Sequence, residues 1–156
     1  WQVYKELRLK ALKENPSFFM KKYFDEVSKS KKAWQEEISP DGGIVIGAFY
    51  EGSLIGVTSL LKGQSPATKG YAISTGSYVE NEHRKSGVFK ALAETAISWA
   101  EENKAFKGIV GSHRDGNLPI ESVMKLYGFE LTGKQMVDWA DGKKAYEFMY
   151  KKSFKR

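Results

Sequence analysis

Apolar positions recur with a helical period in several parts of the chain. The longest stripe, at i, i+3, i+4, i+7, i+8 and i+11, predicts an amphipathic helix over residues 88–102 and joins Phe89, Leu92, Ala93, Ala96, Ile97 and Ala100. A first helix ending near Glu14 is predicted by Trp1, Tyr4, Leu7, Ala11 and Leu12. A second, aromatic helix is predicted by Phe18, Phe19, Tyr23, Phe24 and Val27.

Turn signals separate these helices from the remaining elements. Asn15-Pro16 indicates a stop and a restart, with Asn as the cap and Pro in the first turn of the next helix. Short helices are expected over 31–38 and from Leu118 to the terminating glycine Gly128. Strand-like runs cover residues 44–50, 53–61, 70–79, 106–111, 130–139 and 145–152.

The order of these elements predicts the fold class. Two helices and antiparallel strands come first, then strand, helix, strand and helix, and finally a hairpin around Asp141-Gly142. This order predicts an α/β (α+β) domain with a mixed sheet. The chain has 156 residues without repeats or internal linkers, so we expect one domain over 1–156 with one sizeable core.

A polar, basic loop over residues 80–87 joins the strand that ends in Tyr78-Val79 to the helix that begins at Val88. Because the loop opens a helix, its backbone N–H groups lack helical partners and lie at the positive end of the helix dipole. Arg84 and Lys85 add fixed cations beside them. The loop therefore predicts an anion-binding site.

Two blocks of sequence resemble a known family. Arg84-Lys85-Ser86-Gly87-Val88-Phe89 resembles the Q/R-x-x-G-x-G/A signature of the GCN5-related N-acetyltransferases (GNAT), whose turn amides bind the pyrophosphate of acetyl-coenzyme A. Asn117, eleven residues before Gly128-Phe129, resembles the family's N-x-x-A-x-x-x-Y-x-x-x-G-F block. The opening LRLKALKENPSFF is similar to the first-helix region of one bacterial branch, so the resemblance covers the whole chain.

The resemblance implies a GNAT fold, with a mixed, mostly antiparallel, splayed sheet flanked by helices on both faces. The family's usual first strand would precede Trp1 and is expected to be missing here, either because it was cut away or not resolved, or because the chain does without it. The first two helices would flank the acceptor cleft, and acetyl-CoA would be the cofactor. The resemblance assigns cofactor binding to Tyr78, Val79, Arg84, Lys85, Ser86, Gly87, Val88, Phe89, Lys90, Asn117 and Met124.

Two residues depart from the family pattern. Phe89 stands where the family has Gly or Ala, and we expect its ring to be buried in the helix–sheet core while its N–H faces the phosphates. Met124 stands where many members have the Tyr that protonates the leaving thiolate, and a thioether cannot donate a proton. Tyr127, one helical turn later, is a candidate replacement, although a tyrosine there also serves packing.

Deprotonation of the acceptor is the larger chemical requirement. A lysine-like amine with pKa about 10.4 is neutral in only about one molecule in 2,500 at pH 7. The candidate bases are Glu80, just after its strand, and His113, in the turn after the next strand; ordinary surface polarity is the alternative for both. Asn117 can cap the following helix, and in the family it binds the pantetheine arm or its water.

Composition narrows the function classes. The chain has no cysteine, which excludes disulfides, thiolate metal sites and cysteine nucleophiles. It has no apolar run of membrane-spanning length and no visible signal peptide, so we expect a soluble cytoplasmic protein. The net charge of +6 indicates either a solvated basic surface or attraction of a polyanion such as coenzyme A or nucleic acid.

We therefore predict an acetyl-CoA-dependent N-acetyltransferase that acts on a primary amine of a small molecule or protein. The alternatives are a catalytically impaired acetyl-CoA-binding module, acting as a sensor or scaffold, and a basic nucleic-acid-binding domain. The last lacks a readable helix-turn-helix or aromatic strand motif. The expected partners are the amine acceptor and a second copy of the chain in a homodimer, with no nucleic acid, membrane or metal.

Overall fold

The computed structural model describes residues 1–156, and its helices lie mainly in the N-terminal third and after β3 and β4. The helical elements are α1 (Gln2–Glu14), the 3-10 turn η1 (Pro16–Phe18), α2 (Tyr23–Val27), α3 (Lys31–Glu37), the 3-10 turn η2 (Asn81–His83), α4 (Val88–Glu102) and α5 (Leu118–Leu126). The strands are β1 (Ile44–Tyr50), β2 (Ser53–Lys62), β3 (Ala72–Val79), β4 (Gly108–Arg114), β5 (Glu130–Asp138) and β6 (Lys144–Ser153). None of the helices has the length and apolar character needed to cross a membrane.

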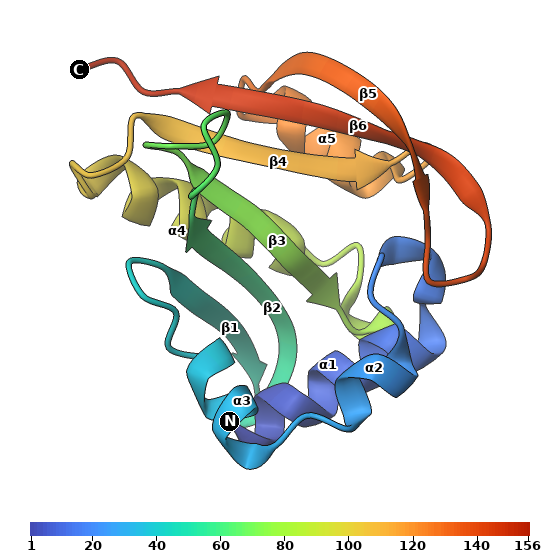
Figure 1. The fold of residues 1–156 in the computed structure, drawn as a ribbon. Helices are drawn as coiled ribbons and strands as arrows, with labels where there is room; N and C mark the ends of the chain where they lie inside the picture. Colours follow the sequence, from blue (N-terminus) through green and yellow to red (C-terminus); the bar gives the residue numbers. More distant parts are fainter.

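One six-stranded sheet contains all the strands, in the order β1-β2-β3-β4-β6-β5 (Figure 1). Every neighbouring pair is antiparallel except β3 and β4, which are parallel. At the β1–β2 hairpin, Glu51 and Gly52 both have positive φ, as expected for a two-residue turn of the primed type. The sheet is thus mixed and mostly antiparallel, as predicted.

The sheet splays at its centre, between β3 and β4. The two strands pair only at Ala72↔Ile109 and Ile73↔Val110. Beyond these pairs the strands diverge (Figure 1), while β4 goes on pairing with β6 as far as Arg114↔Glu147. The unpaired half of β3 therefore faces an opening in the middle of the sheet.

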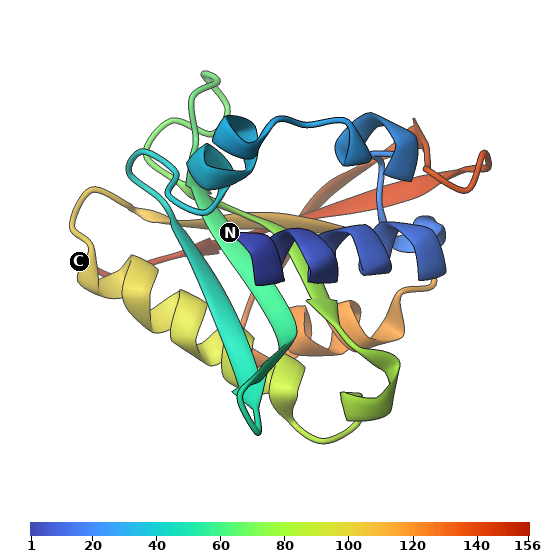
Figure 2. The same cartoon turned by 90° about the horizontal axis from the view of Figure 1, so that it is seen from below.

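Helices cover both faces of the sheet, and each face has its own buried core (Figure 2). On one face α1 and α3 pack on β2 and β3 through Tyr4, Leu7, Ala11, Leu12, Phe19, Trp34, Val57 and Tyr78. On the other face α4 packs through Leu60, Ala72, Ala96, Ala100, Phe106 and Ile109. The alanines of α4 let this helix approach the sheet closely, which fixes the place where its N-terminus meets the opening.

The predicted second helix is wrong in its first half. After η1, Phe19 is extended (φ −126°, ψ 152°), and a separate helix begins only at Tyr23. The cause is a long-range contact, because the carbonyl of Phe19 accepts a hydrogen bond (2.8 Å) from the N–H of Ala140 in the β5–β6 turn. Phe24 is 82% exposed, so the aromatic residues of this segment do not form one buried stripe.

The predicted turn after the fourth strand also needs correction. We expected the strand to end at Gly111, but β4 continues to Arg114 because its last residues pair with β6. His113 therefore lies in a strand and not in a turn. Asn117 occupies the N-cap position of α5, as predicted, but its side chain makes no capping hydrogen bond.

Candidate functional site

The turn between β3 and α4 has the backbone of an anion site. No N–H group of residues 85–90 has a hydrogen-bond partner in the protein, and the first helical bond of α4 is donated by Ala91 to Gly87. Lys85 and Gly87 have positive φ values of 58° and 86°, which curve the backbone so that successive amides converge. A Cβ on Gly87 would meet no atom within 4 Å, so the space before these amides is open.

Arg84 holds this turn in place through its side-chain contacts. Its Nε donates to the carbonyl oxygen of Val79 (2.8 Å), and its Nη2 donates to Asn15 Oδ1 (3.4 Å). The guanidinium also lies over the rings of Phe18 (5.5 Å) and Tyr78 (5.4 Å). These contacts tie the turn to the N-terminal helical segment and engage two of the five N–H donors of Arg84.

The exposed cations near the turn are lysines. Lys85 and Lys90 are exposed, and neither forms an ion pair within the protein. Ser86 Oγ donates to the carbonyl of His83, which closes the turn from its other side. His83 is half-buried against the ring of Tyr50, with 5.2 Å between ring centroids.

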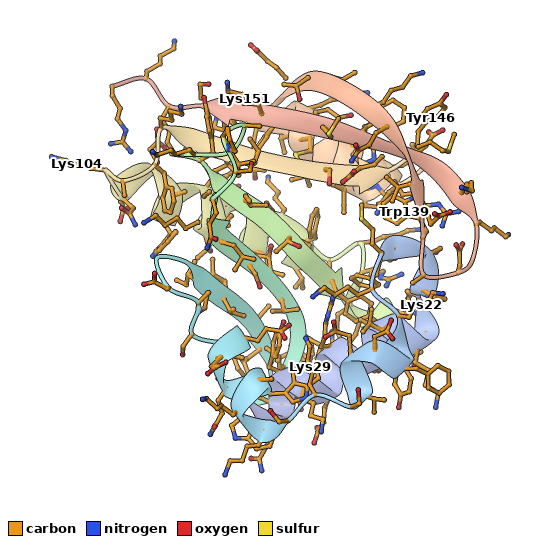
Figure 3. The ribbon with its side chains drawn as sticks, viewed as in Figure 1. Lys22, Lys29, Lys104, Trp139, Tyr146 and Lys151 are labelled. Atoms are coloured by element: carbon orange, nitrogen blue, oxygen red, sulfur yellow. The ribbon has the colours of Figure 1, made fainter.

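A cavity of about 400 Å³ fills the opening between β3 and β4. Its walls include Ser74–Ser77 of β3, Ser112–Arg114 of β4, and apolar residues of α4 and α5. Arg8, Phe18, Phe19, Met20 and Lys21 line it from the N-terminal segment, and Trp139 and Glu147 from the last hairpin. Figure 3 shows Trp139 at the end of β5, where the hairpin meets the N-terminal segment.

The part of the cavity between α4 and α5 is apolar. Phe89, Ala93 and Ile97 of α4 face Ile120, Val123 and Met124 of α5. Met124 is buried, and a Cβ on Gly111 would lie 2.8 Å from its Cε, so a side chain at that point of β4 would require the methionine to shift. Phe89 is only half-buried and lines the cavity, which corrects our expectation of a ring buried in the helix–sheet core.

The sequence-predicted catalytic residues do not all come together. Glu80 and Tyr127 are absent from the cavity lining, whereas His113 and Asn117 belong to it. Glu80 accepts a hydrogen bond from Lys10 Nζ (3.2 Å). Tyr127 donates its hydroxyl to Glu94 Oε1 (2.5 Å), and burial followed by this carboxylate raises the pKa of Tyr127 to about 12.

His113 is buried and both ring nitrogens are engaged. Its Nδ1 lies 2.8 Å from the carbonyl oxygen of Arg114, which can only accept, so Nδ1 carries the proton. Its Nε2 then accepts from the hydroxyl of Tyr150 (3.1 Å), whose ring stacks on the imidazole at 5.2 Å. Burial, and then Glu121, raise the pKa of Tyr150, which keeps that hydroxyl protonated.

Glu147 is the carboxylate of the cavity, and sequence reasoning missed it. It is only 7% exposed, and it accepts hydrogen bonds from Ser112 Oγ (2.5 Å) and Gln135 Nε2 (2.7 Å). No cation lies within ion-pair distance of it. Two oxygens with two neutral donors still have acceptor capacity, so Glu147 can bind a cationic or protic group.

The signal for Glu147 was weak but present. It is the one charged residue of the run Ala145 to Tyr150, at a position that alternates with Tyr146 and Phe148. Only the register Arg114↔Glu147 places it beside the opening. No group of three or more His, Asp or Glu side chains is close enough together to hold a metal ion.

Comparison with known proteins identifies the family. The model of the acetyltransferase (GNAT) family matches residues 5–129, while a search of the curated proteins finds no match. A ribosomal-protein-alanine N-acetyltransferase from Brucella melitensis superposes with a TM-score of 0.81 at 19% identity, over 98% of this chain and 93% of its own.

Two similar structures contain acetyl-CoA. yncA, a putative acetyltransferase from Salmonella typhimurium with its cofactor acetyl-CoA, has a TM-score of 0.80 at 16% identity over 99% of this chain and 88% of its own. A GNAT superfamily phosphinothricin acetyltransferase from Sinorhizobium meliloti in complex with acetyl-CoA has a TM-score of 0.80 at 15% identity over 98% and 82%. These likenesses show the fold, and the family match spans most of the chain: the protein belongs to the GNAT family of acetyltransferases.

Proposed function

We propose that the protein transfers an acetyl group from acetyl-CoA to a primary amine. The observation that carries the proposal is the run of unpaired N–H groups over residues 85–90, which begins a long helix beside the cavity. Phe89 belongs both to this run and to the cavity lining, so an anion at the turn and an acyl group in the cavity belong to one ligand. The acetyl-CoA in the structures from Salmonella typhimurium and Sinorhizobium meliloti supports the same assignment.

The residues present fit acetyl-CoA. The open space before Gly87 admits a pyrophosphate to the free amides, and Lys85 and Lys90 supply positive charge. Val88 and Phe89 would contribute amides, Asn117 has a side chain free to bind the pantetheine arm, and Met124 would pack beside the acyl end. Tyr78, Val79, Arg84 and Ser86 act by shaping the turn.

Glu147 is our proposed general base. It is a carboxylate of the cavity without a cationic partner, so an ammonium group placed beside it gains an ion pair and can pass a proton to it. Glu80 is already paired with Lys10, and the acceptor lone pair of His113 is occupied by Tyr150. Glu80 and His113 were both predicted as bases. Their existing hydrogen bonds support that role less well than the unpaired state of Glu147 does.

The leaving thiolate needs less help than the amine. A thiol with pKa about 8.5 leaves tolerably without an acid, so Met124 is compatible with turnover. Tyr127 has its hydroxyl on Glu94 and lies outside the cavity, so we propose that solvent supplies the proton to the thiolate.

The test combines binding and turnover. Titration calorimetry should detect coenzyme A binding, and coenzyme A release should follow when acetyl-CoA is mixed with an accepted amine. A panel of neutral, cationic and zwitterionic amines covers the acceptor classes. Absence of coenzyme A binding would refute the cofactor assignment.

The buried Met124 favours one second candidate, an acetyl-CoA-binding module without turnover. A thioether gives the cavity no proton donor at the place where the family has a phenol. Coenzyme A binding without release by any amine in the panel would favour this second candidate over catalysis.

A further inference from the structure

Arg8 is a cation of the cavity without an anion. It projects from α1, lines the cavity, and its Nε and Nη1 are buried without a hydrogen-bond partner. Its guanidinium lies over the ring of Phe19, 4.9 Å from the centroid. It takes part in no ion pair of the protein.

The other cations of the cavity are already satisfied. Arg114 is paired with Asp141 (2.7 Å) and donates to the carbonyl of Ser17 (3.2 Å), and Lys21 lies 3.6 Å from Glu26. Glu37, a carboxylate close enough to interact with Arg8, is held by Lys29 (2.6 Å) and Tyr4 (2.8 Å). Buried guanidinium N–H groups without hydrogen-bond partners are energetically costly. A bound ligand with an acceptor group would therefore supply the hydrogen bonds that Arg8 lacks.

The cavity is also lined by a negatively charged side chain without a cationic partner. Glu147 accepts from neutral donors only, so the lining carries one free guanidinium and one free carboxylate. A guanidinium presents parallel N–H groups that match a carboxylate, and a carboxylate matches an ammonium. A ligand that satisfies both groups at once is a zwitterion with an amine and a carboxylate.

We propose that the acceptor is an amino acid, with its carboxylate on Arg8 and its amine at Glu147; this rests on the acetyl transfer proposed above. Phe18, Phe19, Met20 and Trp139 also line the cavity, so an apolar side chain fits best. In the reaction the N–C bond to the acetyl group forms and the thioester C–S bond breaks. The ammonium releases two protons to solvent, the first of them through Glu147, and solvent returns one proton to the thiolate.

A binding comparison with the wild-type protein tests the carboxylate directly. Titration calorimetry measures L-leucine and L-phenylalanine, and the carboxamide of each, against protein saturated with coenzyme A. The carboxamide keeps the amine and the side chain and removes the negative charge. We expect the amino acids to bind about ten- to a hundredfold more tightly than the carboxamides. Equal affinities would overturn the proposal.

Variants with substitutions in α1 test whether Arg8 causes the preference for the amino acid over its carboxamide. Arg8→Gln should abolish the difference between amino acid and carboxamide, and Arg8→Lys should restore part of it. Lys13→Gln, an exposed site on the same helix, removes the same charge and should leave the difference unchanged. If Arg8→Gln does not fold, the wild-type comparison still decides.

Coenzyme A release separates this proposal from the one on which it rests. Release with L-leucine or L-phenylalanine, and slower release with their carboxamides, supports an amino-acid acceptor. Release with tyramine or cadaverine but with no amino acid overturns it and leaves acetyl transfer standing. Amino acids that bind without any release overturn the acceptor role, and no release with any amine also overturns the proposed function.

Discussion

The two ends of the cavity are built in different ways. The cofactor end, where we propose that the pyrophosphate binds, is one continuous piece of chain, from Val79 through the turn to Lys90, and it offers backbone amides without partners. The acceptor end, where we propose that the amine binds, is assembled from α1, η1 and the segment after it, Trp139 of the β5–β6 turn, and β6, and it offers the side chains of Arg8 and Glu147. A backbone site depends on local conformation, whereas a side-chain site depends on how distant elements meet.

This difference indicates which substitutions should impair each end of the cavity. The amides at the cofactor end tolerate many side chains but not a change at Gly87, which must adopt a positive φ and leave open space. The acceptor end tolerates backbone adjustment but depends on single charges. Substitutions that remove the charge of Arg8 or Glu147 should therefore change acceptor binding or the rate of acetyl transfer. Substitutions at the turn should change the affinity for coenzyme A.

The largest effect is expected for Glu147→Gln. The amide keeps the shape of the side chain but cannot accept a proton from the amine. We expect the maximal rate of coenzyme A release to fall by about 10²–10⁴, the range typical of general base catalysis, with coenzyme A affinity unchanged. Steady-state kinetics with an amine that the wild-type protein accepts give the rate, and calorimetry gives the affinity.

Glu80→Gln is the matched control, because Glu80 is also a partly buried carboxylate but bonds to Lys10. Its rate should stay close to that of the wild-type protein. A large loss in Glu80→Gln with full activity in Glu147→Gln would reverse our assignment of the base.

The second effect is expected for Gly87→Glu, at the cofactor end. The side chain enters the open space before the free amides and places a negative charge where a phosphate binds. We expect coenzyme A to bind at least about a hundredfold more weakly by calorimetry, because charge-assisted hydrogen bonds are lost and repulsion is added.

Gly52→Glu separates this effect from backbone strain. Gly52 has a φ of 81°, close to that of Gly87, and equally has nothing within 4 Å of a Cβ, but it lies in the β1–β2 turn. Both variants should lose similar stability in thermal unfolding, and only Gly87→Glu should lose affinity. Equal affinities in the two variants would exclude the turn as the pyrophosphate site.

The contrast also explains what the sequence could predict. The helix over 88–102, the turn before it and the β1–β2 hairpin were predicted correctly, because the apolar period, the glycines and the polar loop are local signals. The fold class was confirmed for the same reason, since the order of elements restricts how they can pack. These features need no knowledge of distant contacts.

The features that were missed all depend on distant contacts. Phe19 leaves the helical conformation because its carbonyl bonds to Ala140, and β4 extends because it pairs with β6. Glu147 enters the cavity only through its register with Arg114. Phe89 continues an apolar stripe in which Leu92, Ala96 and Ala100 are buried, but Phe89 itself is half-buried and lines the cavity that the splay of the sheet leaves.

A smaller effect is expected for Met124→Tyr, where the two ends meet. A phenol at this position restores a proton donor, and we expect the maximal rate to rise by about tenfold or less, because a thiol is already a tolerable leaving group. The larger ring has to fit against Gly111, so thermal stability should fall. Met136→Tyr, on the exposed strand β5, is the control and should change neither quantity. An unchanged rate would mean that protonation of the thiolate does not limit turnover.

The smallest effect on catalysis is expected for Tyr127→Phe, which should leave the rate of coenzyme A release unchanged because the hydroxyl bonds to Glu94 outside the cavity.

The effect of Tyr127→Phe should instead appear in the stability of the protein at alkaline pH. Burial and Glu94 raise the pKa of Tyr127 from 10.0 to about 12, so the folded protein holds this proton more tightly than the unfolded chain. The resulting stabilisation is complete below pH 10 and is lost as the pH rises towards 12. The melting temperatures of the wild-type protein and Tyr127→Phe should therefore converge between these pH values, and a difference that stays constant would contradict the bond. A fall in rate would return Tyr127 to the role of proton donor that its place after Met124 first suggested.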